Sequence, residues 1–232
     1  MILKRRFDVD SRENKIEKIL AVLKFVVCSN DFSNLTLLDV GTGSGIISKG
    51  LSKHFKKVYS VDIVDERLVK DGYTFLKVTD EKLPFCDDTF DIILSNCVIE
   101  HLINQELHLD EVMRVMKNTG YFYLSFPNKY SLFEPHYNLI FLSYLPKKLA
   151  NKYMQFFNKG DSYDIFPFTL SKGMKLCNKF RVNNITPLIV KNPDLFKLDV
   201  YRKIQPFLKI IPLSFIKFIQ YFFPTYIFIL KK

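Results

Sequence analysis

The stretch Leu35-Thr36-Leu37-Leu38-Asp39-Val40-Gly41-Thr42-Gly43-Ser44-Gly45 decides the fold of this chain. Residues 35–40 are apolar almost without interruption, which is typical of a strand buried in a parallel sheet. The next five residues hold three of the eight glycines of the chain. Glycine allows a tight turn and lets a ligand lie directly on backbone N–H groups. The stretch therefore predicts a buried strand followed by a ligand-binding loop.

Helical and strand patterns alternate on both sides of this stretch. Apolar residues recur at helical spacing, and short apolar runs predict further strands. The expected helices are 14–27, 46–55, 64–70 and about 106–117, the last ended by Gly120, and the expected strands are 57–62, 74–78, 90–95 and 121–126. This alternation predicts an α/β fold, a Rossmann-like doubly wound sheet with helices on both faces.

The second half of the chain is less regular. Residues 127–168 are rich in Pro, Tyr and Phe and weak in periodicity, so they read as an insertion after the fifth strand. Beyond them the pattern predicts a short helix capped by Ser171 at 169–180, a strand at 182–186, an apolar and basic segment at 195–223 and a last strand at 225–230. We expect residues 1–232 to form a single domain.

The charge of the chain is concentrated in its C-terminal part. The net charge is +10, but residues 1–144 carry −2 and residues 145–232 carry +12. Hydrophobic residues make up 48%, which excludes wholesale disorder. The uneven distribution of charge along the chain therefore predicts two halves with different tasks.

Targeting and metal signals are missing from the sequence pattern. The four cysteines have no CxxC spacing and only four histidines are present, so we expect neither a disulfide framework nor a metal site. The first residues have no apolar run, and the charge-free stretch 218–230 is too short to cross a bilayer, which takes about 20 residues. We expect a cytoplasmic protein.

The spacing of the loop discriminates between ligands. A dinucleotide fingerprint would need glycine where Ile46 or Ser48 stands, and a P-loop would need Gly-Lys-Ser/Thr, which is absent. Asp62 ends the next strand about 20 residues on, where a carboxylate can accept hydrogen bonds from ribose hydroxyls. Asp80 follows the strand after that. The motif suits a nucleoside with an amino-acid tail better than a pyrophosphate.

Six ordered motifs resemble the class I S-adenosylmethionine-dependent methyltransferases, of the type 11-like domain. They span about residues 35–126 and comprise Leu37–Gly45, Val61–Ile63, Asp80–Phe85, Phe90–Ser95, Val98–Leu102 and Glu111–Gly120. One departure is Asn118-Thr119-Gly120, where the family usually has Pro-Gly-Gly, and it affects a turn. The resemblance implies a seven-stranded sheet with an antiparallel last strand, a cofactor-binding core at 35–126, an acceptor-side insertion at 127–168 and a C-terminal part of the fold at 169–232.

The resemblance also implies a set of residues that bind the cofactor S-adenosylmethionine. The glycines would approach the methionine part, and Asp39 would hold its amino group or the loop. Asp62 would bind the ribose hydroxyls, while Ile63 would pack on the adenine. Asp80 would accept a hydrogen bond from the adenine amino group with Glu81 beside it, and Asn96 would lie near the methyl group. The expected cofactor-binding set is Asp39, Gly41, Gly43, Gly45, Asp62, Ile63, Asp80, Glu81 and Asn96.

The expected activity is methylation of a hydroxyl, which needs a base as well as the cofactor. Histidine has the right unperturbed pKa, and His101 follows the fourth strand. Glu134 and His136 lie in the insertion that shapes the acceptor pocket in this family. We therefore expect His101, Glu134 and His136 to be catalytic, although each can equally serve a structural role.

Several acceptors stay open. A small-molecule, glycan or lipid-linked acceptor is favoured, because residues 127–146 resemble enzymes of cell-surface polysaccharide or lipid-linked metabolite synthesis and ubiquinone-pathway O-methyltransferases. The basic C-terminal third also fits an RNA methyltransferase, which is less favoured. Residues 207–219 interleave lysines with apolar residues, which fits peripheral contact with an anionic membrane or a core helix. A non-catalytic cofactor-binding or membrane-surface module is the remaining alternative.

Overall fold

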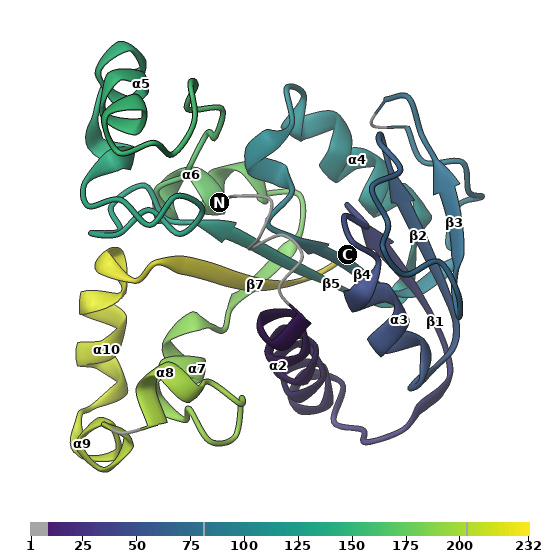
Figure 1. The fold of residues 1–232 in the computed structure, drawn as a ribbon. Coiled ribbons are helices and arrows are strands. Elements are labelled where there is room, and N and C mark those ends of the chain that lie inside the picture. The colour runs from purple at the N-terminus through teal and green to yellow at the C-terminus, as the bar shows by residue number, and fades with distance from the viewer. Residues whose placement is uncertain (1–8, 81, 203) are drawn as a thin grey trace.

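The computed structural model describes residues 9–80, 82–202 and 204–232 (Figure 1). Seven strands form one sheet in the order β3-β2-β1-β4-β5-β7-β6. Strand β7 is antiparallel to both of its neighbours, and the pairings among the first five strands are parallel. The strands are β1 Phe32–Val40, β2 Phe55–Asp62, β3 Thr74–Lys77, β4 Phe90–Asn96, β5 Met116–Pro127, β6 Arg181–Asn184 and β7 Thr225–Lys231. The expected Rossmann-like sheet with an antiparallel last strand is confirmed.

Helices cover both faces of the sheet. Helices α2, α3 and α7 lie on one side, and α4 and α6 lie on the other (Figure 1). The helices are α2 Val9–Val27, α3 Ile46–Ser52, α4 Gln105–Val115, α5 Lys147–Phe156, α6 Leu170–Leu176, α7 Thr186–Lys191, α8 Asp199–Arg202, α9 Gln205–Ile210 and α10 Leu213–Ile219. Short 3-10 turns occupy Ile99–His101, Leu142–Tyr144 and Gln220–Phe222.

The alternation of side chains along each strand separates two apolar cores. In β4, Ile92 and Leu94 pack with α2 and α3, whereas Ile93 packs with α4. In β7, Ile229 joins the α2 side and Phe228 joins the α4 side. Successive strand residues point to opposite faces, so a strand covered on both faces has to be apolar throughout. This explains why the apolar runs that form the strands are continuous in the sequence.

The expectation of a helix over 64–70 is wrong. The segment forms a loop that is fastened to the glycine loop, because Leu68 and Val69 both donate their N–H groups to the carbonyl of Ser44. Arg67 pairs with Asp65 and lies over the ring of Phe75, which attaches the same loop to β3. The segment therefore obtains its hydrogen bonds from tertiary contacts rather than from a helical ladder.

Other boundaries also differ from expectation. Helix α4 ends at Val115, and Gly120 lies inside β5 because Met116 already pairs with Phe90. Thr169, not Ser171, caps α6 through a hydrogen bond from the N–H of Lys172.

Residues 127–168 build a small core of their own. It contains Tyr137, Leu142 and Met154 together with Tyr163, and it includes helix α5, which the sequence pattern did not reveal. The N–H of Phe166 donates to the carbonyl of Glu100 at 3.0 Å, so the segment is attached to the turn that follows β4. The boundaries of this insertion as a functional unit stay a prediction.

Helices α9 and α10 are packed on one side only. Leu208 and Ile216 are buried against Val190 and Phe223, whereas Phe207 and Phe218 are 70% and 73% exposed. Of the helices in the described ranges, none has the length and apolar character that crossing a bilayer requires.

Candidate functional site

The glycine loop lies at the carboxyl edge of the sheet, between the ends of β1, β2 and β4. Val40 pairs with Val61 of β2 and with Ser95 of β4, so the chain leaves all three strands at adjacent points. The N–H groups of Gly41 and Thr42 both donate to the carbonyl of Val61. This edge is where open parallel sheets bind ligands.

Two glycines of the loop are required by close packing. A Cβ on Gly41 would lie 2.3 Å from Val98 Cγ2, and a Cβ on Gly45 would lie 2.2 Å from both the carbonyl oxygen of Val69 and Oη of Tyr73. Both residues also adopt positive φ angles, of 83° and 78°. These glycines let the loop sit directly on the turn after β4 and on the 64–73 loop.

Gly43 is different, because nothing lies within 4 Å of the position of its Cβ. Its N–H donates to Asp62 Oδ2 at 2.9 Å, while Asp62 Oδ1 accepts a long bond of 3.4 Å from Val64. The neighbouring Thr42 Oγ1 is buried without a hydrogen-bond partner in the described part of the chain. The loop thus offers open space, an acidic side chain and an unsatisfied hydroxyl.

Asp39 turns inward and holds the loop. Its side chain is 3% exposed and accepts a 2.5 Å hydrogen bond from the hydroxyl of Ser48 on α3. Burial raises the pKa of Asp39 to about 7, and the charge of Asp62 acts in the same direction, while Ser48 and Arg12 oppose it. Of the two expected roles, the geometry fits that of holding the loop.

Two of the remaining expected cofactor residues, Ile63 and Asn96, lie at the same edge of the sheet. Ile63 follows β2 and is 58% exposed, and Asn96 ends β4, where its Oδ1 accepts from Ser125. Asp80 is exposed and accepts from the N–H of Lys82. Glu81 lies outside the described residues. The roles of these residues toward a cofactor stay predictions.

The three expected catalytic residues come together, and a fourth joins them. His136 Nδ1 lies 2.9 Å from Glu134 Oε1, and its Nε2 lies 3.4 Å from Glu100 Oε1 (on the turn after β4). The rings of His101 and His136 are perpendicular, with centroids 5.5 Å apart. Both carboxylates are completely buried. Glu134 is fixed further by the N–H of Tyr137, which donates to Oε2 at 2.6 Å.

Two buried carboxylates favour the protonated form of His136. Burial by itself lowers its pKa, but the carboxylates of Glu100 and Glu134 outweigh burial and raise the pKa to about 9. A protonated imidazole cannot accept a proton from a hydroxyl. The raised pKa therefore disfavours His136 as a general base at neutral pH, and its catalytic role stays a prediction.

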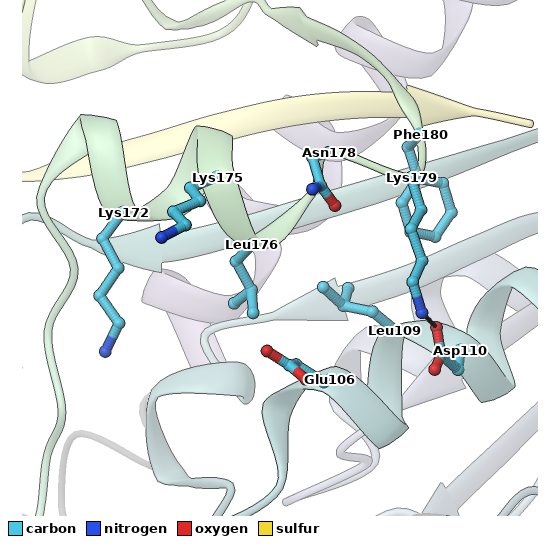
Figure 2. Close-up of a pocket in the computed structure, with 9 residues that line it drawn as sticks. All are labelled: Glu106, Leu109, Asp110, Lys172, Lys175, Leu176, Asn178, Lys179 and Phe180. Carbon is cyan, nitrogen blue, oxygen red and sulfur yellow. Dashed lines mark hydrogen bonds and ion pairs between the residues drawn. The ribbon is translucent and has the colours of Figure 1, made fainter.

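A separate crevice of about 340 Å³ lies between α4 and α6 (Figure 2). Lys172 and Lys175 of α6 line one side, and Glu106 of α4 lines the other. Lys179 and Asp110 form an ion pair across it at 2.5 Å. No residue of the expected site lines this crevice, so it is distinct from the carboxyl edge of the sheet.

Comparison with known proteins finds methyltransferases among the similar sequences and structures. A family model described as a methyltransferase domain matches residues 38–124. The chain is 27% identical over 113 residues to the mitochondrial ubiquinone biosynthesis O-methyltransferase of Bos taurus, covering 43% of this chain and 30% of that protein. It is 27% identical over 175 residues to the ubiquinone biosynthesis O-methyltransferase of Rickettsia prowazekii, covering 70% and 69%.

Solved structures agree on the fold. The plantazolicin methyltransferase BpumL has a TM-score of 0.63 at 16% identity, covering 99% of this chain and 87% of that one. Curated relatives such as the bovine enzyme and a protein of Methanocaldococcus jannaschii are matched over only 30% and 50% of their length. Residues 38–124 thus match a methyltransferase domain, and the chain as a whole shares the fold of the solved class I methyltransferases.

Glu100 is the site residue that the sequence analysis missed. It stands in the motif Val98–Leu102, but its importance lies in its contact with His136, which is remote in the sequence. The local signal that this glutamate is buried is the apolar character of Ile99 before it and of Leu102 two positions after it.

Replacing Asp39 by Asn is expected to flatten the pH dependence of stability. In the folded protein Asp39 keeps its proton up to about pH 7, whereas in the unfolded chain it ionises near pH 3.9. Folding therefore has to return a proton to Asp39, and the fold loses stability as the pH rises between these values. Chemical denaturation without ligand should show D39N gaining about 2–4 kcal/mol relative to wild type from pH 4 to pH 8. Parallel curves for the two proteins would contradict the assignment.

Proposed function

We propose that this chain transfers the methyl group of S-adenosylmethionine to a hydroxyl of a small-molecule, glycan or lipid-linked acceptor. The observation that carries the proposal is the contact between Gly41 and Val98, which brings the glycine loop against the turn that bears Glu100 and His101. A cofactor-binding loop and a cluster of acidic and histidine side chains thereby share one edge of the sheet.

The residues of the loop fit the cofactor. The open space at Gly43 and the unsatisfied hydroxyl of Thr42 leave room and a polar partner for a ligand on the backbone. Asp62 would hold the ribose hydroxyls, and the exposed side chain of Ile63 would pack on the adenine ring. When bound, the cofactor supplies an already reactive methyl group, so the protein has mainly to align the acceptor and exclude water.

The cluster beside the loop suits a hydroxyl acceptor. Two of the curated relatives named above, those of Bos taurus and Rickettsia prowazekii, are called O-methyltransferases of ubiquinone biosynthesis, which supports oxygen as the methylated atom. Glu134 and Glu100 hold His136 in one orientation, and the exposed ring of His101 lies against it. In this proposal the cluster lies beside the acceptor, His101 helps the acceptor hydroxyl to lose its proton, and Glu134 and His136 keep the cluster oriented.

To test the proposal, the protein is incubated with methyl-labelled S-adenosylmethionine and a cell extract, and the label is followed into the fractions of the extract. We expect label in the small-molecule or lipid fraction, and loss of transfer in D62A together with a 10–100-fold weaker affinity for S-adenosylhomocysteine by calorimetry. D31A is the matched control, because Asp31 precedes β1 at the opposite edge of the sheet. Label in RNA would favour the RNA alternative, and unchanged affinity of D62A would refute the site.

Helices α9 and α10 favour a second proposal, that the protein contacts anionic membranes. Their exposed face combines Phe207, Ile210 and Phe218 with the exposed lysines Lys209 and Lys217. Aromatic and aliphatic side chains insert at the lipid interface, and each lysine near an anionic surface adds about 1 kcal/mol of attraction. The net charge of +12 over residues 145–232 acts in the same direction. Such a contact would bring the enzyme to a lipid-linked acceptor.

Vesicle co-sedimentation tests this contact. Wild-type protein should bind vesicles containing phosphatidylserine and dissociate as salt is raised, because screening weakens the charge attraction. The double variant F207S/F218S should lose most of this binding. F156S is the control, since Phe156 is 79% exposed but lies on α5. Wild-type sedimentation at background would end the proposal.

A further inference from the structure

Three possible metal ligands meet beside the glycine loop. Glu100 and His101 stand in the 3-10 turn after β4, and His136 comes from the segment after β5. One ligand atom from each residue lies within 4.8 Å of the other two. The 3.4 Å between His136 Nε2 and Glu100 Oε1 is close to the separation of about 3.3 Å between two ligands of a tetrahedral zinc ion.

Glu134 orients His136 in the way that is usual for a metal-binding histidine. It occupies Nδ1 at 2.9 Å and is itself held by the N–H of Tyr137. A ligating imidazole almost always gives its other ring nitrogen to a carboxylate or carbonyl, which fixes the ring and directs the free nitrogen at the metal. Here the other ring nitrogen is Nε2, which faces Glu100, and a bound metal ion would replace the proton that this nitrogen carries in the metal-free protein.

Glu100 supplies an independent sign that a cation belongs here. Its side chain is 0% exposed, yet neither Oε1 nor Oε2 has a hydrogen-bond partner among the described residues. The contact with His136 is an ion-pair contact too long for a good hydrogen bond, and no hydrogen bond or ion pair joins Glu100 to Lys15, the α2 cation that also acts on it. A buried carboxylate with two unsatisfied oxygens is costly unless something binds them.

We propose that Glu100, His101 and His136 bind a first-row divalent cation, with Glu134 orienting His136. Two imidazoles and one carboxylate are the ligands of catalytic zinc sites and of mononuclear iron or manganese sites, whereas Mg²⁺ and Ca²⁺ prefer oxygen alone. Three protein ligands leave a position open. Under the proposed function, on which this role rests, an acceptor hydroxyl at that position would ionise more readily.

No local sequence pattern predicts this cluster of ligands. Cysteine spacing is uninformative because the ligands are a glutamate and two histidines. Two of the ligands are adjacent and the third is 35 positions later, so only the fold brings them together.

Metal uptake tests the proposal directly and without cofactor. Protein stripped with a chelator and dialysed against Zn²⁺ or Mn²⁺ should retain one equivalent by elemental analysis. The variants E100Q and H136A should bind at least 10-fold more weakly, and E134Q should also lose affinity because it no longer fixes the ring. H54A is the matched control, since His54 is exposed and lies outside the cluster. No uptake by wild type, or full uptake by E100Q, would overturn the proposal.

A second measurement needs no variant, so a misfolded mutant cannot obscure the result. The chain has four histidines, and NMR of ¹⁵N-labelled imidazoles reports on each of them. Adding Zn²⁺ should shift the ring signals of His101 and His136 and leave those of His54 and His108 in place. Shifts confined to other histidines would contradict the site. Methyl transfer is not involved in either readout, so failure of this proposal and failure of the proposed function are distinguishable.

Discussion

The close approach of Gly41 to Val98 is the contact on which the rest of the site depends. Any side chain at position 41 would overlap Val98, so the loop after β1 rests directly on the turn after β4. That turn carries Glu100, whose carbonyl accepts the N–H of Phe166 and so attaches the 127–168 segment to the same edge. Strand order determines which loops meet, and the absence of a Cβ allows them to touch.

Asp39 and Glu100 show two uses of a buried carboxylate. Asp39 has a hydroxyl partner in Ser48 and a raised pKa, so it can stay neutral and serve the loop as a hydrogen-bonding group. Within the described part of the chain, neither oxygen of Glu100 has a hydrogen-bonding partner, and Oε1 lies 3.4 Å from Nε2 of His136. The first arrangement stabilises the loop, whereas the second leaves a buried charge that a bound cation would stabilise.

The sheet could be predicted from the sequence because its strands are covered on both faces and therefore read as continuous apolar runs. The glycine loop and Asp62 followed from their spacing. The sequence pattern gave wrong element boundaries where backbone groups bond to residues distant in the sequence and not to their helical neighbours. The 64–70 segment looks helical, but Ser44 takes its N–H groups, and Met116 joins β5 where the helical pattern still continues. The pairing of Glu100 with His136 could not be predicted, because it arises from the packing of the 127–168 segment.

The central claim is that one edge of the sheet holds the cofactor loop and the histidine cluster together. Titration of ¹⁵N-labelled protein with S-adenosylhomocysteine tests it most directly, because each backbone amide reports its own contact. We expect the largest shifts at Gly41, Gly43, Ile63 and Asn96, with smaller ones at His101. Shifts centred on the crevice between α4 and α6, or none at saturating ligand, would contradict it.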